Sequence, residues 1–232
     1  MASQFSGDRP PSVTPPPPPN LPPAAGNGLI GRVQRVLLQP KDERHRVDAE
    51  PMTMQQIFVG WVLPLAAIAP VAGLIRTLLF PITVMGITIR QSPASAIGNA
   101  IFTWVLAVLM VFVMALIVDA LAPTFGGRKD QVQATKVVAF SSTAGWVAGV
   151  FQIIPSLGLI GLIGLAAAVY GIYLLYLALP VMMKVPQDKA VGYIAVIIVV
   201  AIVAFFLVGA LAGLGASLFA PATPSLGSIT VS

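Results

Sequence analysis

The chain contains no cysteine, only one histidine, and just 9% charged residues. The absence of cysteine excludes disulfide bonds, a thiolate nucleophile and any cysteine-ligated metal. His45 lies in a charged stretch, where a lone histidine is typical of a solvated surface. We find no nucleophile elbow, no phosphate-binding glycine loop followed by lysine, and no carboxylate pair within an apolar stretch. The sequence therefore predicts no enzyme, no bound metal and no cofactor.

What the chain does contain is long apolar stretches. About 20 helical residues cross the ~30 Å hydrocarbon core of a bilayer, and a backbone in lipid must satisfy its own hydrogen bonds. The chain is 57% hydrophobic with a mean hydropathy of +0.91. We therefore predict an all-α membrane protein, a bundle of five transmembrane helices. The five stretches cover residues 57–79, 96–118, 136–154, 158–179 and 191–217.

The basic residues are distributed unevenly among the segments that connect these stretches. Eleven of the 13 Lys and Arg residues precede the first stretch or lie in every second connection after it. Under the positive-inside rule this bias places the N-terminus in the cytoplasm and the C-terminus outside. Five crossings likewise require the two ends to lie on opposite sides of the membrane. The basic pI of about 9.9 is thus explained by membrane topology, and we expect no nucleic-acid binding.

The segments outside the bundle differ in composition. Residues 1–27 are rich in proline and predict a disordered tail, and residues 218–232 predict a flexible C-terminal tail. Residues 28–56 predict a cytoplasmic amphipathic helix and a linker before the bundle of 57–217. In that helix the apolar residues recur with helical spacing between two arginines. We predict that this helix, over residues 28–39, is interfacial, with its apolar face at the membrane surface among lipid headgroups. The alternative is that the same face packs against the bundle.

Proline and glycine mark special positions within the stretches. Pro64 and Pro70 predict a break in the first helix, which is either a tolerated kink or part of a transport pathway beside Asn99, Ser141, Ser142 and Thr143. Glycines spaced along the later stretches allow close helix packing, within the chain or with another subunit. These are Gly145, Gly149, Gly161, Gly164, Gly171, Gly209 and Gly213.

Cations and tyrosines close to the expected cytoplasmic ends are candidates for contact with lipid headgroups or a partner. Lysine and arginine attract anionic lipids at this depth, and tyrosine is enriched at membrane interfaces. The candidate residues are Arg32, Arg35, Lys184, Lys189, Tyr176 and Tyr193.

Two motifs carry a resemblance to a known family. Residues 171–193 read GIYLLYLALPVMMKVPQDKAVGY, and the earlier segment has PKDE at 40–43 and AEPMT at 49–53. Over residues 28–215 the chain resembles the bacterial branch of the Yip (Ypt-interacting protein) domain family. The resemblance implies five helices with a cytoplasmic N-terminus. Eukaryotic members carry an acidic-Leu-Tyr-Gly-Pro motif linked to Rab-type GTPases, which is absent here, so GTPase binding is not expected.

Together these features favour a non-enzymatic multi-pass protein of the bacterial inner membrane. We expect it to organise that membrane or to act as an accessory subunit, with membrane lipids and another membrane protein or a homo-oligomer as partners. The alternative is a small channel or transporter for a neutral or lipid-like solute. The apolar stretches hold no mid-membrane charge, which argues against ion-coupled transport.

Overall fold

The computed structural model describes residues 28–80, 82–84, 87–89 and 92–218. The regular secondary structure of the described residues is helical apart from one short β-hairpin. The predicted tails, 1–27 and 219–232, lie outside them, whereas Leu218 ends the last helix. The elements are α1 Leu29–Leu38, α2 Pro40–Ala49, α3 Met54–Ile57, η1 Phe58–Val62, α4 Leu63–Ala66, α5 Ile68–Leu79, β1 Ile82–Val84, β2 Ile87–Ile89, α6 Pro93–Leu121, η2 Ala122–Phe125, α7 Gln131–Ala148, η3 Gly149–Ile153, α8 Leu157–Met182 and α9 Gln187–Leu218.

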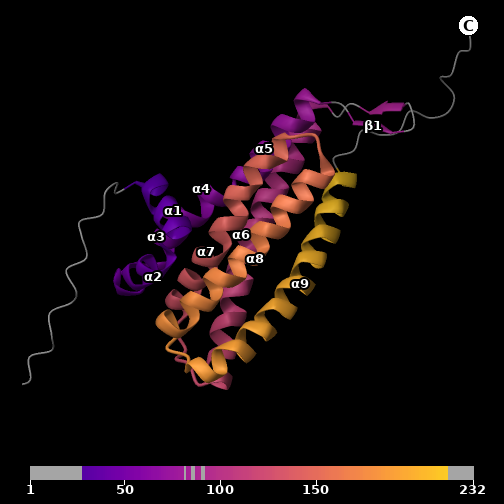
Figure 1. Ribbon diagram of the computed structural model, residues 1–232. Helices are drawn as coiled ribbons and strands as arrows, with labels where there is room; N and C mark the ends of the chain where they lie inside the picture. The colour runs from indigo at the N-terminus through magenta and orange to yellow at the C-terminus, as the bar shows by residue number, and fades with distance from the viewer. Residues whose placement is uncertain (1–27, 81, 85–86, 90–91, 219–232) are drawn as a thin grey trace, which may run out of the picture.

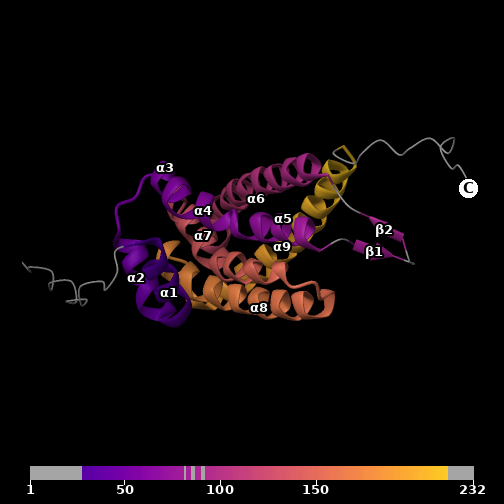
Figure 2. The ribbon, with the colours of Figure 1, turned by 90° about the horizontal axis from the view of Figure 1, so that it is seen from above.

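The long helices form an elongated bundle with α1 and α2 beside one end (Figure 1). The view in Figure 2 shows the β1–β2 hairpin at the opposite end, next to the end of α9. Helix α7 occupies the centre, because it packs against α6 and α8 and also contacts α1, α3 and α5. Half of its residues are buried, including an unbroken run from Ala134 to Phe140.

Four helical stretches of the described chain are long and apolar enough to cross a membrane: Met54–Leu79, Pro93–Phe125, Gly158–Met182 and Gln187–Gly215. They confirm an all-α multi-pass membrane architecture. The predicted stretch 136–154 corresponds to α7 and η3, which do not meet this criterion. A helix enclosed by other helices can carry serine and threonine, since its surface need not face lipid.

The outer face of α6 is apolar along most of its length, as expected for a helix in contact with lipid. Large apolar side chains are exposed along this helix at intervals of three or four residues, which is the period of one helical face. A contiguous apolar surface of this length is typical of contact with lipid. The exposed residues are Ile97, Ile101, Val105, Leu109, Phe112 and Leu116.

The predicted break at Pro64 and Pro70 is present in the first membrane helix. A π-helical turn, η1, precedes Pro64, and the helix is interrupted again at Ala67, three residues before Pro70. Each proline lacks the N–H that would bond the carbonyl four residues earlier. Near the second interruption the indole Nε1 of Trp104 donates to the carbonyl oxygen of Leu63 at 3.1 Å. The Trp104 side chain, from α6, thereby donates to a backbone carbonyl for which the irregular helix provides no N–H donor.

Two elements were not expected from the sequence. Helix α2 starts directly at Pro40, where the apolar pattern of α1 ends; proline fits the first turn of a helix because no hydrogen bond is required of its nitrogen there. Strands β1 and β2 pair antiparallel with Ile82 opposite Ile89. Their sequence signal was a pair of short β-branched runs, ITV and ITI, separated by two residues.

Candidate functional site

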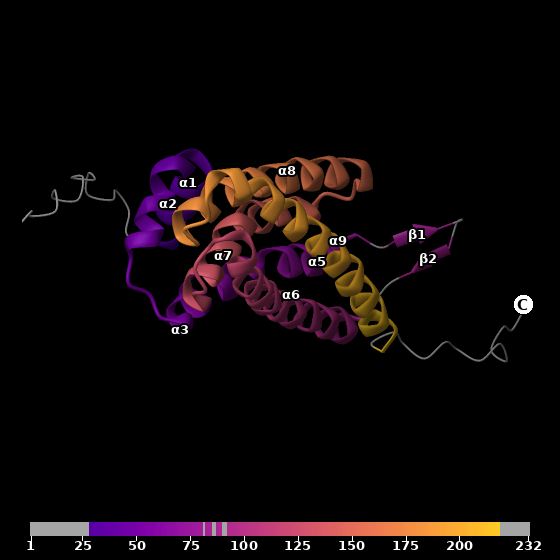
Figure 3. The ribbon, with the colours of Figure 1, turned by 90° about the horizontal axis from the view of Figure 1, so that it is seen from below.

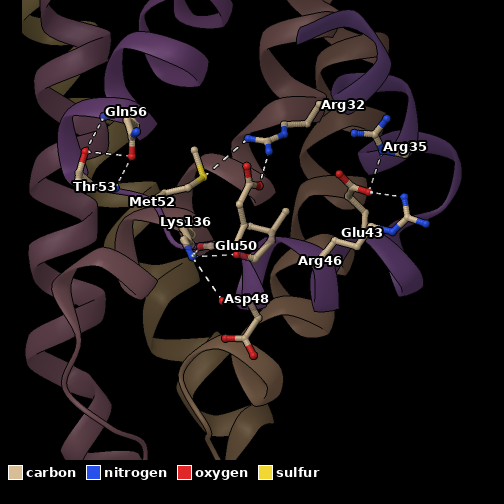
Figure 4. Close-up of polar contacts among 11 residues, drawn as sticks. Arg32, Arg35, Glu43, Arg46, Asp48, Glu50, Met52, Thr53, Gln56 and Lys136 are labelled. Atoms are coloured by element: carbon tan, nitrogen blue, oxygen red, sulfur yellow. Dashed lines mark hydrogen bonds and ion pairs between the residues drawn. The ribbon is translucent and has the colours of Figure 1, made fainter. Parts of the chain in front are cut away.

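The most deeply buried cation of the described chain is Lys136, on the first turns of α7. Its side chain is 3% exposed, and its Nζ donates to the carbonyl oxygens of Val47 at 2.9 Å, Asp48 at 3.4 Å and Glu50 at 2.7 Å (Figure 4). These carbonyls end α2, where helix groups lack internal partners and the helix dipole favours a cation. The nearby carboxylates of Asp48 and Glu50 add a favourable charge interaction with the Lys136 ammonium. Lys136 thus joins α7 to the end of α2.

Ion pairs connect α1 with α2 and with the linker that follows it (Figure 4). Arg32 pairs with Glu50. Glu43 is 3% exposed and accepts from Arg35 Nε at 3.0 Å, with Arg46 Nη1 at 4.0 Å from the same oxygen. A buried carboxylate requires such partners, because the cost of removing its charge from water is otherwise uncompensated.

Trp61, within the π-helical turn, links this region to the bundle core. Its Nε1 donates to Thr143 Oγ1 of α7 at 3.1 Å, and its side chain is 2% exposed. The guanidinium carbon of Arg32 lies 5.1 Å from the ring centroid, a cation–π distance. Trp61, on η1, therefore contacts both α1 and α7.

Helix α8 provides further anchors. The hydroxyl of Tyr170 donates to the Leu37 carbonyl at 2.7 Å, and Arg44 Nη1 donates to the Leu177 carbonyl at 3.1 Å. In the loop after α8, Lys184 Nζ lies 2.7 Å from Asp48 Oδ2. We call α1 and α2 the docked helix pair, because polar contacts from α7, α8 and the following loop hold them against the bundle.

The apolar face of α1 is shared between the bundle and the surroundings. Val36 is completely buried, and Leu29, Val33 and Leu37 pack against the core. Ile30 and Leu38, in contrast, are 75% and 78% exposed. The structure therefore shows most of this face packed against the bundle and not in the predicted interfacial position, with two large apolar side chains left outside.

The linker between the docked helix pair and the bundle ends in a helix cap. Thr53 Oγ1 accepts from the backbone N–H of Gln56 at 3.3 Å, and Gln56 Oε1 accepts from the N–H of Thr53 at 2.8 Å. This reciprocal arrangement is a capping box and fixes the start of α3. The AEPMT motif thus closes α2 through Glu50 and opens α3 through Thr53.

The predicted contact residues have different environments. Arg32, Arg35 and Lys184 form ion pairs within the chain. Tyr176 is 48% exposed and Lys189 is exposed, so both are available to lipid or a partner.

Tyr193 does not fit the predicted headgroup contact. Its side chain is fully buried, its hydroxyl donates to the carbonyl of Val118, and its ring stacks on Phe125 at a centroid distance of 4.8 Å. Tyr193 thereby packs the first two turns of α9 against the end of α6 and against η2.

The glycines divide into two groups. A Cβ on Gly149 would lie 2.6 Å from Ala69 Cβ, and a Cβ on Gly171 would lie 3.0 Å from the Ser141 carbonyl oxygen. These two glycines permit close packing inside the chain. Gly215, which the sequence reasoning missed, similarly faces the ring of Phe102. A Cβ would meet no atom within 4 Å at the remaining predicted packing positions, Gly145, Gly161, Gly164, Gly209 and Gly213.

An apolar cavity of about 550 Å³ lies among α6, α7, α8 and α9. Figure 3 shows α9 crossing the bundle diagonally, away from α8 towards the first residues of α6. The lining is apolar except for Ser141 and Ser142. Ser141 donates to the Val137 carbonyl at 2.9 Å, whereas Ser142 has no hydrogen-bond partner among the described residues. Both serines belong to the group predicted for a transport pathway.

This arrangement of apolar spans around a less apolar central helix defines a multi-pass α-helical membrane protein. The family model of the Yip1 domain matches residues 35–210. The chain therefore belongs to the Yip1 domain family, as the resemblance indicated. No curated protein and no solved structure was found to be similar.

Proposed function

We propose that the chain is a non-enzymatic accessory subunit of a bacterial inner membrane, which binds another membrane protein or a second copy of itself and so organises that membrane. The supporting observation is the docked helix pair. Contacts from α7, α8 and the loop after α8 hold it in one orientation, and Ile30 and Leu38 project outward from it. Rigid apolar side chains beside a charged rim are typical of a protein-binding surface.

We further propose that α7 and η3 form a fifth crossing, with the N-terminus in the cytoplasm and the C-terminus outside. The alternation of Lys and Arg supports this orientation. Lys136 and Lys184 both contact the docked helix pair, so basic residues from two different connections lie at the same end of the bundle. This clustering supports the proposed orientation. Lipid headgroups at that end would meet the exposed Lys189 and Tyr176.

Purification of the full chain from its native membrane in mild detergent tests this function. We expect a stoichiometric membrane-protein partner or a defined oligomer, and we expect its loss in the double variant Ile30→Ser, Leu38→Ser. Both positions are exposed, so the substitutions leave the core intact. Val191→Ser is the matched control, because Val191 is 64% exposed on α9 and distant in sequence from the pair.

A monomer without any partner in the wild type would contradict this function. That result, combined with movement of a fluorescent lipid across vesicles containing the chain, would instead favour the second candidate, a small channel or transporter for a lipid-like solute. The cavity with Ser141 and Ser142 supports this alternative, because its apolar lining includes the Ser142 hydroxyl, which has no hydrogen-bond partner within the described part of the chain.

A further inference from the structure

A smaller, polar cavity lies at the other end of the bundle, away from the docked helix pair. It has a volume of about 190 Å³ and is enclosed by α5, α6 and η3, beside the helix break at Pro70. At roughly 30 Å³ per water molecule, this volume corresponds to about six waters. Nearly half of the lining residues are polar: Arg76, Thr77, Asn99, Thr103 and Gln152.

No described residue compensates the positive charge of this cavity. Arg76 has no hydrogen bond or ion pair among the described residues, and no carboxylate lines the cavity. An arginine guanidinium presents several donors in a planar fork, a geometry that suits the oxygens of a phosphate. Arg76 lies one turn before the end of the span Met54–Leu79, and Asn99 lies two turns after the start of the span Pro93–Phe125. The ends of membrane spans are expected at the depth of lipid headgroups.

The remaining polar groups add hydrogen-bond acceptors. Asn99 Oδ1 is buried without a hydrogen-bond partner, which is costly unless a ligand or water donates to it. The Thr77 hydroxyl donates to the Gly73 carbonyl at 2.9 Å, so only its lone pairs remain available. Gln152 Oε1 would lie 3.4 Å from a Cβ at Gly73, so the absence of a side chain on Gly73 leaves room for it. A ligand for this site must therefore offer hydroxyl donors as well as an anion.

We propose that this cavity binds a phosphate ester of a small polyol, with its phosphate on Arg76 and a hydroxyl donating to Asn99 Oδ1. The headgroup of phosphatidylglycerol has this chemistry, and so does free glycerol phosphate. The inference is independent of the proposed partner-binding function, because it concerns the opposite end of the bundle.

The test uses the full chain in a neutral detergent, with native mass spectrometry of bound lipid. Phosphatidylglycerol should bind more tightly than phosphatidylcholine or phosphatidylmethanol with the same acyl chains. Arg76→Gln should weaken phosphatidylglycerol binding about tenfold, as expected for the loss of a charge-assisted contact. Lys129→Gln, which removes the same charge from an exposed loop position, should leave it unchanged.

A second variant separates recognition of the hydroxyl from recognition of the charge. Phosphatidylmethanol has the phosphate but lacks the glycerol hydroxyls, so Asn99→Leu should abolish the preference between these two lipids while both still bind. Competition by free glycerol phosphate would identify a soluble ester as the ligand, and competition by lipid alone would identify a headgroup. Equal binding of phosphatidylglycerol and phosphatidylcholine, or equal effects of Arg76→Gln and Lys129→Gln, would overturn the proposal. If Arg76→Gln fails to fold, an unchanged lipid preference in Asn99→Leu overturns it equally.

Discussion

Replacing Lys136 with methionine is expected to lower the free energy of unfolding by about 3 kcal/mol, the scale measured when one partner of a buried charged contact is removed. The substitution keeps most of the apolar stem but removes the donors that bond the carbonyls of Val47, Asp48 and Glu50. The carbonyls of Val47 and Glu50 would lose this donor at the end of α2, whereas the Asp48 carbonyl would keep a contact with Gln133 Nε2 at 3.4 Å. We expect a lower thermal midpoint in detergent and faster proteolysis between residues 39 and 53.

Lys184→Met is the matched control for this experiment. Lys184 also contacts Asp48, through its carboxylate, but the lysine side chain is 50% exposed. An exposed ion pair contributes about 1 kcal/mol or less, so the thermal midpoint should change little. If Lys136→Met and Lys184→Met have equal effects, or if the 39–53 segment stays protected in Lys136→Met, Lys136 does not hold the docked helix pair in place.

Gly149→Ala is expected to destabilise the bundle by about 2 kcal/mol, within the range for overpacking a close contact. The new Cβ would lie 2.6 Å from Ala69 Cβ and 3.0 Å from Ala69 Cα. Neither atom belongs to a flexible side chain, so α5 and η3 would have to move apart. The backbone of Gly149, at φ −57° and ψ −23°, suits alanine. The expected loss of stability is therefore due to the contact with Ala69. Thermal unfolding in detergent measures the effect.

Gly145→Ala should have the opposite sign. Gly145 is one turn earlier on α7, and a Cβ there meets no atom within 4 Å. Alanine is favoured over glycine inside a helix by about 1 kcal/mol, so this variant should be neutral or slightly stabilised. A loss of stability in Gly145→Ala similar to that in Gly149→Ala would mean that the contact with Ala69 is not the reason for the glycine.

The two glycines illustrate how far sequence reasoning extends here. Gly145 and Gly149 form one Gly-x-x-x-Gly pair, and the sequence predicted packing at both. Only Gly149 faces a neighbouring backbone within the chain. Which of two glycines meets another helix depends on the rotation of α7 within the bundle, and the contacts with α5, α6 and α8 set that rotation. Periodicity within one helix contains no information about it.

The candidate site was predictable in part. Arg32, Arg35 and Lys184 were singled out as cations near the membrane surface, and the structure places all three in ion pairs around the docked helix pair. The contacts of Lys136 could not be predicted, because the carbonyls that it contacts lie 86 to 89 residues away in the sequence. Tyr193 was assigned to the membrane interface from its position near a helix end, but Phe125 and Val118 bury it.

The sequence by itself determined the membrane class, four of the five predicted apolar spans, the break at Pro64 and Pro70, and the family. Each of these depends on local composition: apolar length relative to bilayer thickness, or the missing N–H of a proline. Tertiary structure alone decided that α7 is enclosed, that α1 and α2 dock on it, and that the polar groups near Arg76 and Asn99 surround one cavity. These features depend on contacts between segments far apart in the chain. The sequence pattern of a single segment is the same whether its polar face meets water, lipid headgroups or another helix.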